Sequence, residues 1–177
     1  MPYPAAKSAF DLYKEGKTTQ EIRMLISMVL LVRGFRSRLD EELRRIDQSA
    51  SRMEALGAIL NMEGNPSQSE VARRLRIEGA TITRMVDILS KEGLVERLPD
   101  PKDRRVNLLA LTPKGEEETR KIFAVYDMMR DHLLENMTVE EMTEFQRLTD
   151  KMLGRLDEPV NRKMRIDELP RRDRLRD

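Results

Sequence analysis

The amino-acid sequence predicts a mostly α-helical fold that carries one small β-hairpin. Apolar residues recur at three- and four-residue steps over several long segments, which is typical of amphipathic helices. The chain is also rich in Ala, Leu, Met, Glu, Lys and Arg, which favour helices over strands. Two short apolar runs, residues 94–98 and 106–111, flank a turn and predict the two strands of the hairpin.

The composition excludes several classes of site. The 177 residues fit one domain with terminal extensions, and they include no cysteine, which rules out disulfides, thiol sensing and zinc–thiolate sites. With His132 as the single histidine, we expect neither a metal nor a cofactor. There is no Gly-rich phosphate loop, nucleophile–base pair or HExxH motif, so we expect no enzyme.

The overall charge balance does not identify a partner. Lys and Arg number 33 against 32 Asp and Glu, so only the placement of charge can indicate a polyanion. No apolar run reaches the roughly 18 residues that span a bilayer, and no signal peptide follows the start. We therefore expect a cytoplasmic protein without a membrane partner.

The first third of the chain predicts an N-terminal arm followed by a long helix. Residues 1–17 contain two prolines and a glycine and predict an arm with one short helix over 6–14. Thr18 and Glu21 have the spacing of a capping box, which predicts a helix over 19–47. Such a helix is too long for a small domain to cover, so we expect it to pack on another chain as well.

Three shorter helices and the hairpin follow. A helix that opens at Ser51 ends before Gly64 and Pro66. Ser67 and Glu70 form a second capping box that opens a short helix. A break at residues 76–78 leads to a helix over 79–92. The predicted apolar face of this helix consists of Ile82, Met85, Val86 and Leu89.

Two further helices and a charged tail complete the prediction. Thr112 followed by Pro113 is typical of a helix start and opens a second long helix. Thr138 and Glu141 form another capping box, before the last helix. Residues 159–177 alternate charge with little to bury, so we expect a mobile or partner-dependent tail.

The order of elements over residues 51–112 is the connectivity of a winged helix-turn-helix. The helix over 79–92 has a polar face with Thr81, Thr83 and Arg84, side chains that can hydrogen-bond base edges. Phosphate contacts are expected from residues around the preceding short helix: Ser67, Arg73, Arg74 and Arg76. For the helix alone a solvated charged face is the better explanation, because amphipathic helices are common, but the hairpin that follows favours DNA binding.

Four motifs in this region resemble the MarR family of bacterial transcription regulators. They are TRMVDIL over 83–89, GLVER over 93–97, DPKDRR over 100–105 and LALTPKG over 109–115. Each motif is weak alone, and the joint match over residues 67–115 is specific. The resemblance extends by helix order alone over about 19–156, and it covers neither the arm nor the tail.

The resemblance implies a homodimer that binds double-stranded DNA. Residues 18–50 and 113–158 would form the helical dimerisation region, and the two recognition helices would enter successive major grooves of a pseudo-palindromic operator. Thr81, Thr83 and Arg84 would face the major groove. At the wing, Asp103 would brace Arg105 in the minor groove, while the remaining basic residues there, Lys102 and Arg104, would meet phosphates.

The resemblance also implies regulation by a small molecule. Family members usually repress, and release DNA when a compound, often aromatic and acidic, binds between the dimerisation helices and the winged domain. The sequence assigns no residue to such a pocket. Six methionines could line it or simply fill the core, and helical spacing favours the core: Met24, Met28, Met53, Met62, Met128 and Met129. The alternative function is a winged helix used for protein or RNA contacts without operator recognition.

Overall fold

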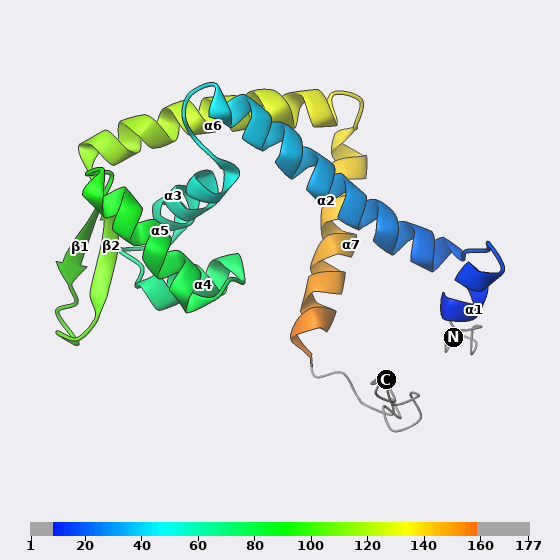
Figure 1. Ribbon diagram of the computed structural model, residues 1–177, viewed down its shortest axis with the longest axis horizontal. Helices are drawn as coiled ribbons and strands as arrows, with labels where there is room; N and C mark the ends of the chain where they lie inside the picture. The colour runs from blue at the N-terminus through cyan, green and yellow to red at the C-terminus, as the bar shows by residue number, and fades with distance from the viewer. Residues whose placement is uncertain (1–8, 159–177) are drawn as a thin grey trace, which may run out of the picture. The chain divides into compact units, whose positions relative to one another are not determined.

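The computed structural model describes residues 9–158 and confirms a mostly helical fold with one antiparallel hairpin (Figure 1). The chain divides into two compact units after His132. The helices are α1 (Ala9–Lys14), α2 (Gln20–Arg44), α3 (Ala50–Asn61), α4 (Gln68–Leu75), α5 (Gly79–Lys91), α6 (Pro113–Leu134) and α7 (Val139–Asp157), and the strands are β1 (Val95–Pro99) and β2 (Asn107–Leu111). The predictions for residues 1–8 and for the tail, 159–177, lie outside the described residues.

The start of α2 differs by one residue from the prediction. Thr19, and not Thr18, is the N-cap: its Oγ1 accepts a hydrogen bond from the Ile22 backbone N–H at 3.4 Å. The Thr18 hydroxyl instead donates to the Thr19 carbonyl. The predicted capping box between Thr18 and Glu21 is therefore wrong, because two adjacent threonines offer equivalent caps and the sequence does not choose between them.

The connection from α2 to α3 also differs from the prediction. Helix α2 ends at Arg44, and Asp47 takes a left-handed conformation with φ of 55°, which stops the helix before the expected residue 47. Ser49 then caps α3 through the Arg52 N–H at 3.3 Å, so α3 begins at Ala50 and not at Ser51. The Asp40 carboxylate accepts from the Ala50 N–H at 2.7 Å and holds the two helices together.

One hydrophobic core joins the C-terminal half of α2 to α3, α4, α5, the hairpin and α6. Its fully buried side chains include Leu43, Leu56, Val86, Leu109 and Ile122, each with no exposed surface. The predicted inner face of α5 is confirmed in this core, with Met85 half-buried at its edge. This core fixes the outer face of α5 at the surface of the unit.

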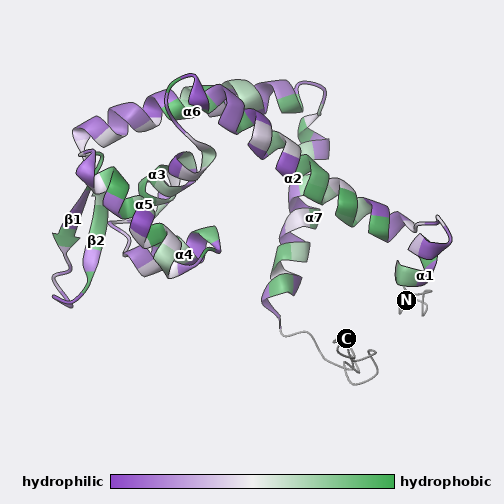
Figure 2. Ribbon diagram, in the orientation of Figure 1, coloured by the Kyte–Doolittle hydropathy of each residue, from purple (hydrophilic) through white to green (hydrophobic). Residues whose placement is uncertain are grey.

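Other helical surfaces lack such cover within the protomer. The first half of α2 exposes a continuous apolar segment, visible as a green stretch in Figure 2, that includes Leu25, Leu30 and Val32 at 56%, 61% and 65% exposure. Helix α7 has no buried residue, and Phe145 and Leu156 lie exposed on it. Met24 and Met128 are exposed as well, so core filling accounts for Met53, Met62 and Met129 but not for these two.

The hairpin is attached tightly to the start of α6. Val95 pairs with Leu111 at its base. Thr112 then donates its backbone N–H to the Leu94 carbonyl at 3.0 Å and its hydroxyl to the Gly93 carbonyl at 2.6 Å. The first turn of α6 lies so close that a Cβ on Gly115 would stand 1.9 Å from the Leu94 carbonyl oxygen. Only glycine fits at this position.

Replacement of Gly115 by alanine should therefore destabilise the protein by at least about 2 kcal/mol, because backbone and not a flexible side chain must move. Urea unfolding at equilibrium measures the change. Gly79→Ala is the matched control, since nothing lies within 4 Å of a Cβ there, and it should shift the free energy of unfolding by no more than about 1 kcal/mol. Equal midpoints for the two variants would contradict the close approach.

Candidate nucleic-acid interface

Helices α4 and α5 form a helix-turn-helix whose geometry is set locally. The predicted capping box at Ser67 is present: its hydroxyl accepts from the Glu70 N–H at 3.3 Å, and the Glu70 carboxylate accepts from the Ser67 N–H at 2.8 Å. The Ser67 backbone N–H and then the Ser67 hydroxyl, which both donate to the Glu70 carboxylate, lower the pKa of Glu70. Arg76 then adopts a left-handed conformation with φ of 53°, which ends α4 and turns the chain into α5.

The outer face of α5 presents polar side chains to solvent. Thr81, Thr83 and Arg84 are all exposed, opposite the buried Ile82 and Val86. The Thr83 hydroxyl donates to the Gly79 carbonyl at 2.9 Å, which leaves its oxygen lone pairs as acceptors. Within residues 9–158, Arg84 has no hydrogen-bond or ion-pair partner, so its guanidinium remains available to a ligand.

The wing turn holds one arginine in a fixed position. Asp103 accepts three hydrogen bonds from Arg105, from its backbone N–H at 3.0 Å, its Nε at 3.1 Å and its Nη2 at 3.0 Å. The side chain of Arg105 is nevertheless 89% exposed. The pair lowers the pKa of Asp103, first through the Arg105 side chain and then through its backbone N–H. Asp103 therefore restrains an arginine whose side chain remains exposed to solvent.

The rest of the turn adds two exposed cations. The Asp100 carboxylate accepts from the Lys102 backbone N–H at 2.8 Å, and the Asp100 N–H donates to the Val106 carbonyl at 3.0 Å, which closes the turn. The side chains of Lys102 and Arg104 are exposed and have no partner among the described residues. The wing tip therefore carries three exposed basic side chains, of which one is restrained.

The residues expected at the phosphate backbone occupy different environments. Arg73 and Arg76 are exposed on and just after α4. Ser67 is only 7% exposed and its hydroxyl bonds to Glu70 in the cap, so its side chain offers little to a phosphate. Arg74 lies on the rim of a cavity and not with the other two arginines.

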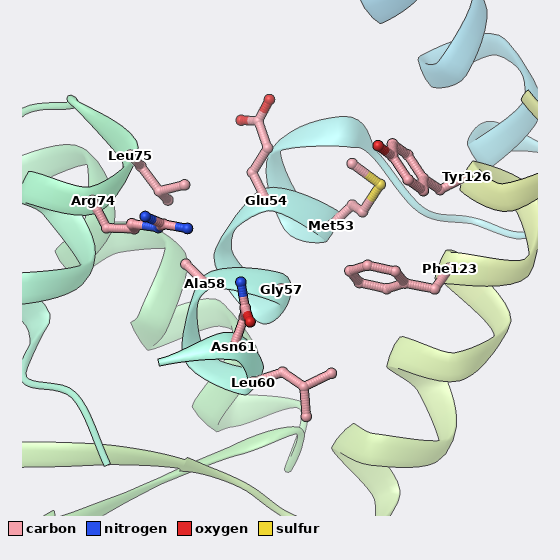
Figure 3. A pocket seen from close by; sticks show the side chains of 10 residues that line it. All are labelled: Met53, Glu54, Gly57, Ala58, Leu60, Asn61, Arg74, Leu75, Phe123 and Tyr126. Carbon is pink, nitrogen blue, oxygen red and sulfur yellow. The ribbon is translucent and has the colours of Figure 1, made fainter. Parts of the chain in front are cut away.

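This cavity, of about 510 Å³, lies between α3, α4 and α6. Figure 3 shows the Phe123 and Tyr126 rings on one side and the Arg74 guanidinium directed into it from the other. The full lining is Met53, Glu54, Gly57, Ala58, Leu60, Asn61, Arg74, Leu75, Phe123 and Tyr126. A second cavity of about 450 Å³ shares Arg74 and reaches Thr81 of α5. The walls are largely apolar, with one cation, Arg74, and one anion, Glu54, which is paired with Arg36.

Comparison with known proteins decides the family. The MarR family model matches residues 51–106. The chain is 30% identical to wild-type MarR from E. coli in its apo form, covering 73% of this chain and 95% of that one, with a TM-score of 0.61. The chain belongs to the MarR family. This confirms the resemblance seen in the sequence and identifies the chain as a winged-helix transcriptional regulator and not an enzyme.

Two further solved structures of transcriptional regulators are similar over comparable lengths. A cysteine-to-serine mutant of E. coli MarR complexed with operator DNA is 28% identical, covering 76% of this chain and 94% of that one, with a TM-score of 0.64. The transcriptional regulator BldR from Sulfolobus solfataricus is 27% identical, covering 77% and 96%, with a TM-score of 0.67. The exposed α5 face and the wing described above therefore belong to a MarR-type winged helix.

The described residues contain neither a membrane-spanning helix nor a metal-binding cluster. No helix within 9–158 is long and apolar enough to cross a membrane. The same residues contain no cluster of three or more His, Asp or Glu side chains that could hold a metal ion.

The sequence reasoning missed one contact between the two candidate DNA-binding elements of this MarR-type unit. Asp87, on the outer face of α5, forms an ion pair with Arg97 in the middle of β1. Opposite charges at these positions are visible in the sequence, but their pairing depends on how the hairpin packs against α5. No local pattern could have revealed it.

The restraint at the wing tip can be tested by titration. Arg105→Ala should raise the pKa of Asp103 toward its ordinary value of 3.8, because the guanidinium that stabilises the carboxylate is removed. Carbon-13 NMR of the side-chain carboxyl measures the pKa. The pair favours the folded state above pH 3.8, and this contribution is lost as the pH falls through the lowered pKa. Arg104→Ala is the control and should leave the pKa low; an unchanged pKa in Arg105→Ala would refute the restraint.

Proposed function

We propose that this MarR-family protein is a homodimeric repressor that binds a pseudo-palindromic operator in double-stranded DNA and leaves it when a small ligand binds. The observation that carries the proposal is the combination of an unpartnered Arg84 on the outer face of α5 with a restrained, exposed Arg105 at the wing tip. The MarR structure on operator DNA supports it by similarity.

The two elements suit different grooves. An α-helix fits the major groove, where Arg84 can bind guanine through two acceptors and the exposed Thr81 and Thr83 can bond base edges. A narrow minor groove concentrates negative potential and attracts an arginine, and Arg105 is held for that contact by Asp103. Contacts to phosphates come from the neighbouring cations: Arg73, Arg76, Lys102 and Arg104.

A second copy of the chain would cover the exposed apolar surfaces. The first half of α2 exposes Leu25, Leu30 and Val32, and α7 exposes Phe145 and Leu156, far more than a stable monomer usually presents to water. Residues 18–50 and 113–158 would thus form the dimerisation region around the winged domain, 51–112. Two-fold symmetry then matches a palindromic site, whose half-sites lie about 34 Å apart.

The cavity between α3, α4 and α6 suits the ligand. Phe123 and Tyr126 offer aromatic stacking and Arg74 offers a charge-assisted hydrogen bond, a combination that fits an aromatic acid. The ring of Tyr126 also packs edge-on against Phe35 of α2, with 6.1 Å between centroids. A ligand at this place would touch both the proposed dimerisation helices and the helix-turn-helix.

DNA recognition can be tested on a duplex selected from a random pool by the wild-type protein. Arg84→Ala should cost about 1–3 kcal/mol and relax base preference at one position of each half-site. Arg105→Ala should weaken binding without splitting the dimer, and its melting temperature should change little because the Asp103–Arg105 pair is exposed. Fluorescence anisotropy across a salt series gives the affinities. If wild-type binding lacks a steep salt dependence, the alternative function in protein or RNA contacts is favoured instead.

The dimer can be tested by one charge on α2. Leu30→Glu should yield monomers, because a carboxylate would be buried without a partner at the interface. Light scattering after size-exclusion chromatography gives the mass. Arg38→Glu, on the same helix and already exposed, is the control and should remain dimeric. A dimeric Leu30→Glu protein would show that the first half of α2 lies outside the interface.

Ligand release can be tested with a thermal-shift screen of aromatic acids, phenols and acyl thioesters. We expect an aromatic acid to raise the melting temperature and to weaken operator binding at the same concentrations. Arg74→Gln should reduce the stabilisation by the acid but not by a neutral phenol of the same shape, since only the acid uses the guanidinium. If no stabilising compound weakens operator binding, the protein represses constitutively.

A further inference from the structure

Among the described residues, the ion pair between Asp87 and Arg97 is the one charged side-chain contact between α5 and β1. Arg97 Nη2 donates to Asp87 Oδ1, and the two side chains are 32% and 49% exposed. Both residues lie outside the core, so the pair is not needed to exclude water from it. It links the recognition helix to the wing at the surface that also carries Arg84.

The core holds the buried side of the wing through Val95 and Leu109, and the other restraints on the wing lie at its base and along β2. It is a two-stranded hairpin, and such a hairpin is marginal without support. Its base is fixed where Thr112 binds the Leu94 carbonyl, and one side of β2 is held where the Leu109 N–H donates to the Pro66 carbonyl at 2.8 Å. Arg97 lies midway along β1, opposite Leu109. The contact with Asp87 therefore supports β1 between its fixed base and the free tip.

We propose that the Asp87–Arg97 pair positions the wing relative to the recognition helix, so that Arg105 can reach the minor groove while Arg84 occupies the major groove. The inference rests on the proposed function. In this role Asp87 and Arg97 are positioning residues that act through Arg105. A carboxylate on a DNA-facing surface repels phosphates, and its pairing with Arg97 offsets that repulsion while adding the restraint.

The direction in which Asp87→Ala changes the affinity for DNA distinguishes a positioning role from simple charge repulsion. Removal of a carboxylate near DNA should by itself tighten binding, because less negative charge faces the phosphates. If Asp87 positions the wing, Asp87→Ala should instead weaken binding to the selected duplex by about two- to fivefold. Glu78→Ala is the matched control: Glu78 is the exposed N-cap residue immediately before α5 and makes no side-chain cap bond. It should bind as tightly as the wild type or more tightly.

A double-mutant cycle tests whether the two residues act together. Arg97→Gln should weaken binding, and adding Asp87→Ala should cost nothing more, because the same restraint is already lost. Additive losses would overturn the proposal, and so would tighter binding by Asp87→Ala. If Asp87→Ala binds DNA more tightly and Arg97→Gln binds it more weakly than the wild type, Arg97 is a phosphate contact and not a positioning residue.

Footprinting at saturating protein supplies a readout that loss of stability would not produce. Dimethyl sulfate reports guanine N7 in the major groove, and hydroxyl radicals report sugars along the minor groove. Asp87→Ala should keep the N7 protection by α5 and lose the minor-groove protection by the wing. Equal loss or equal retention of both would overturn the proposal. If the wild type binds no duplex, the proposed function is wrong. If the wild type binds but Asp87→Ala shows the same footprint, only the positioning role is wrong, so the two results can be told apart.

Discussion

The close approach of α6 to the Leu94 carbonyl is the constraint on which the DNA-facing unit depends. Gly115 allows the helix to begin against this carbonyl, where Thr112 binds the Gly93 and Leu94 carbonyls and Lys114 binds the Glu92 carbonyl at 2.8 Å. The end of the recognition helix, the base of the wing and the start of α6 therefore form one joint. A side chain at residue 115 would separate all three.

The joint is also connected to the cavity. Arg52 of α3 donates to the Glu92 carboxylate at 2.9 Å, which lowers the pKa of Glu92, and α3 forms one wall of the cavity. Helix α6 begins at the joint and carries Phe123 and Tyr126 into the opposite wall. Because both walls end at the same joint, we expect a ligand that separates α3 from α6 to shift α5 and the wing as well.

What the sequence predicted well was coded locally. The capping boxes at Ser67 and Thr138 are present because the hydroxyl and the carboxylate lie three residues apart. Each side chain then accepts a hydrogen bond from the backbone N–H of the other residue. The start of α2 was misplaced because Thr18 and Thr19 are equivalent as local signals. The Asp87–Arg97 pair, the approach at Gly115 and the cavity beside Arg74 depend on contacts distant in sequence, so no local pattern could supply them.

The same packing explains how a chain with a formal net charge of +1 can present exposed cations that have no acidic partner. Three acidic side chains of the winged domain form ion pairs with arginines: Glu92 with Arg52, Asp87 with Arg97 and Glu54 with Arg36. Arg84, Lys102 and Arg104 are left without acidic partners in the described part of the chain. Because the attraction of a polyanion depends on where the charges lie and not on their total, these exposed cations can attract one. Paired acids thus leave the polyanion-binding cations exposed while keeping the whole chain close to neutral.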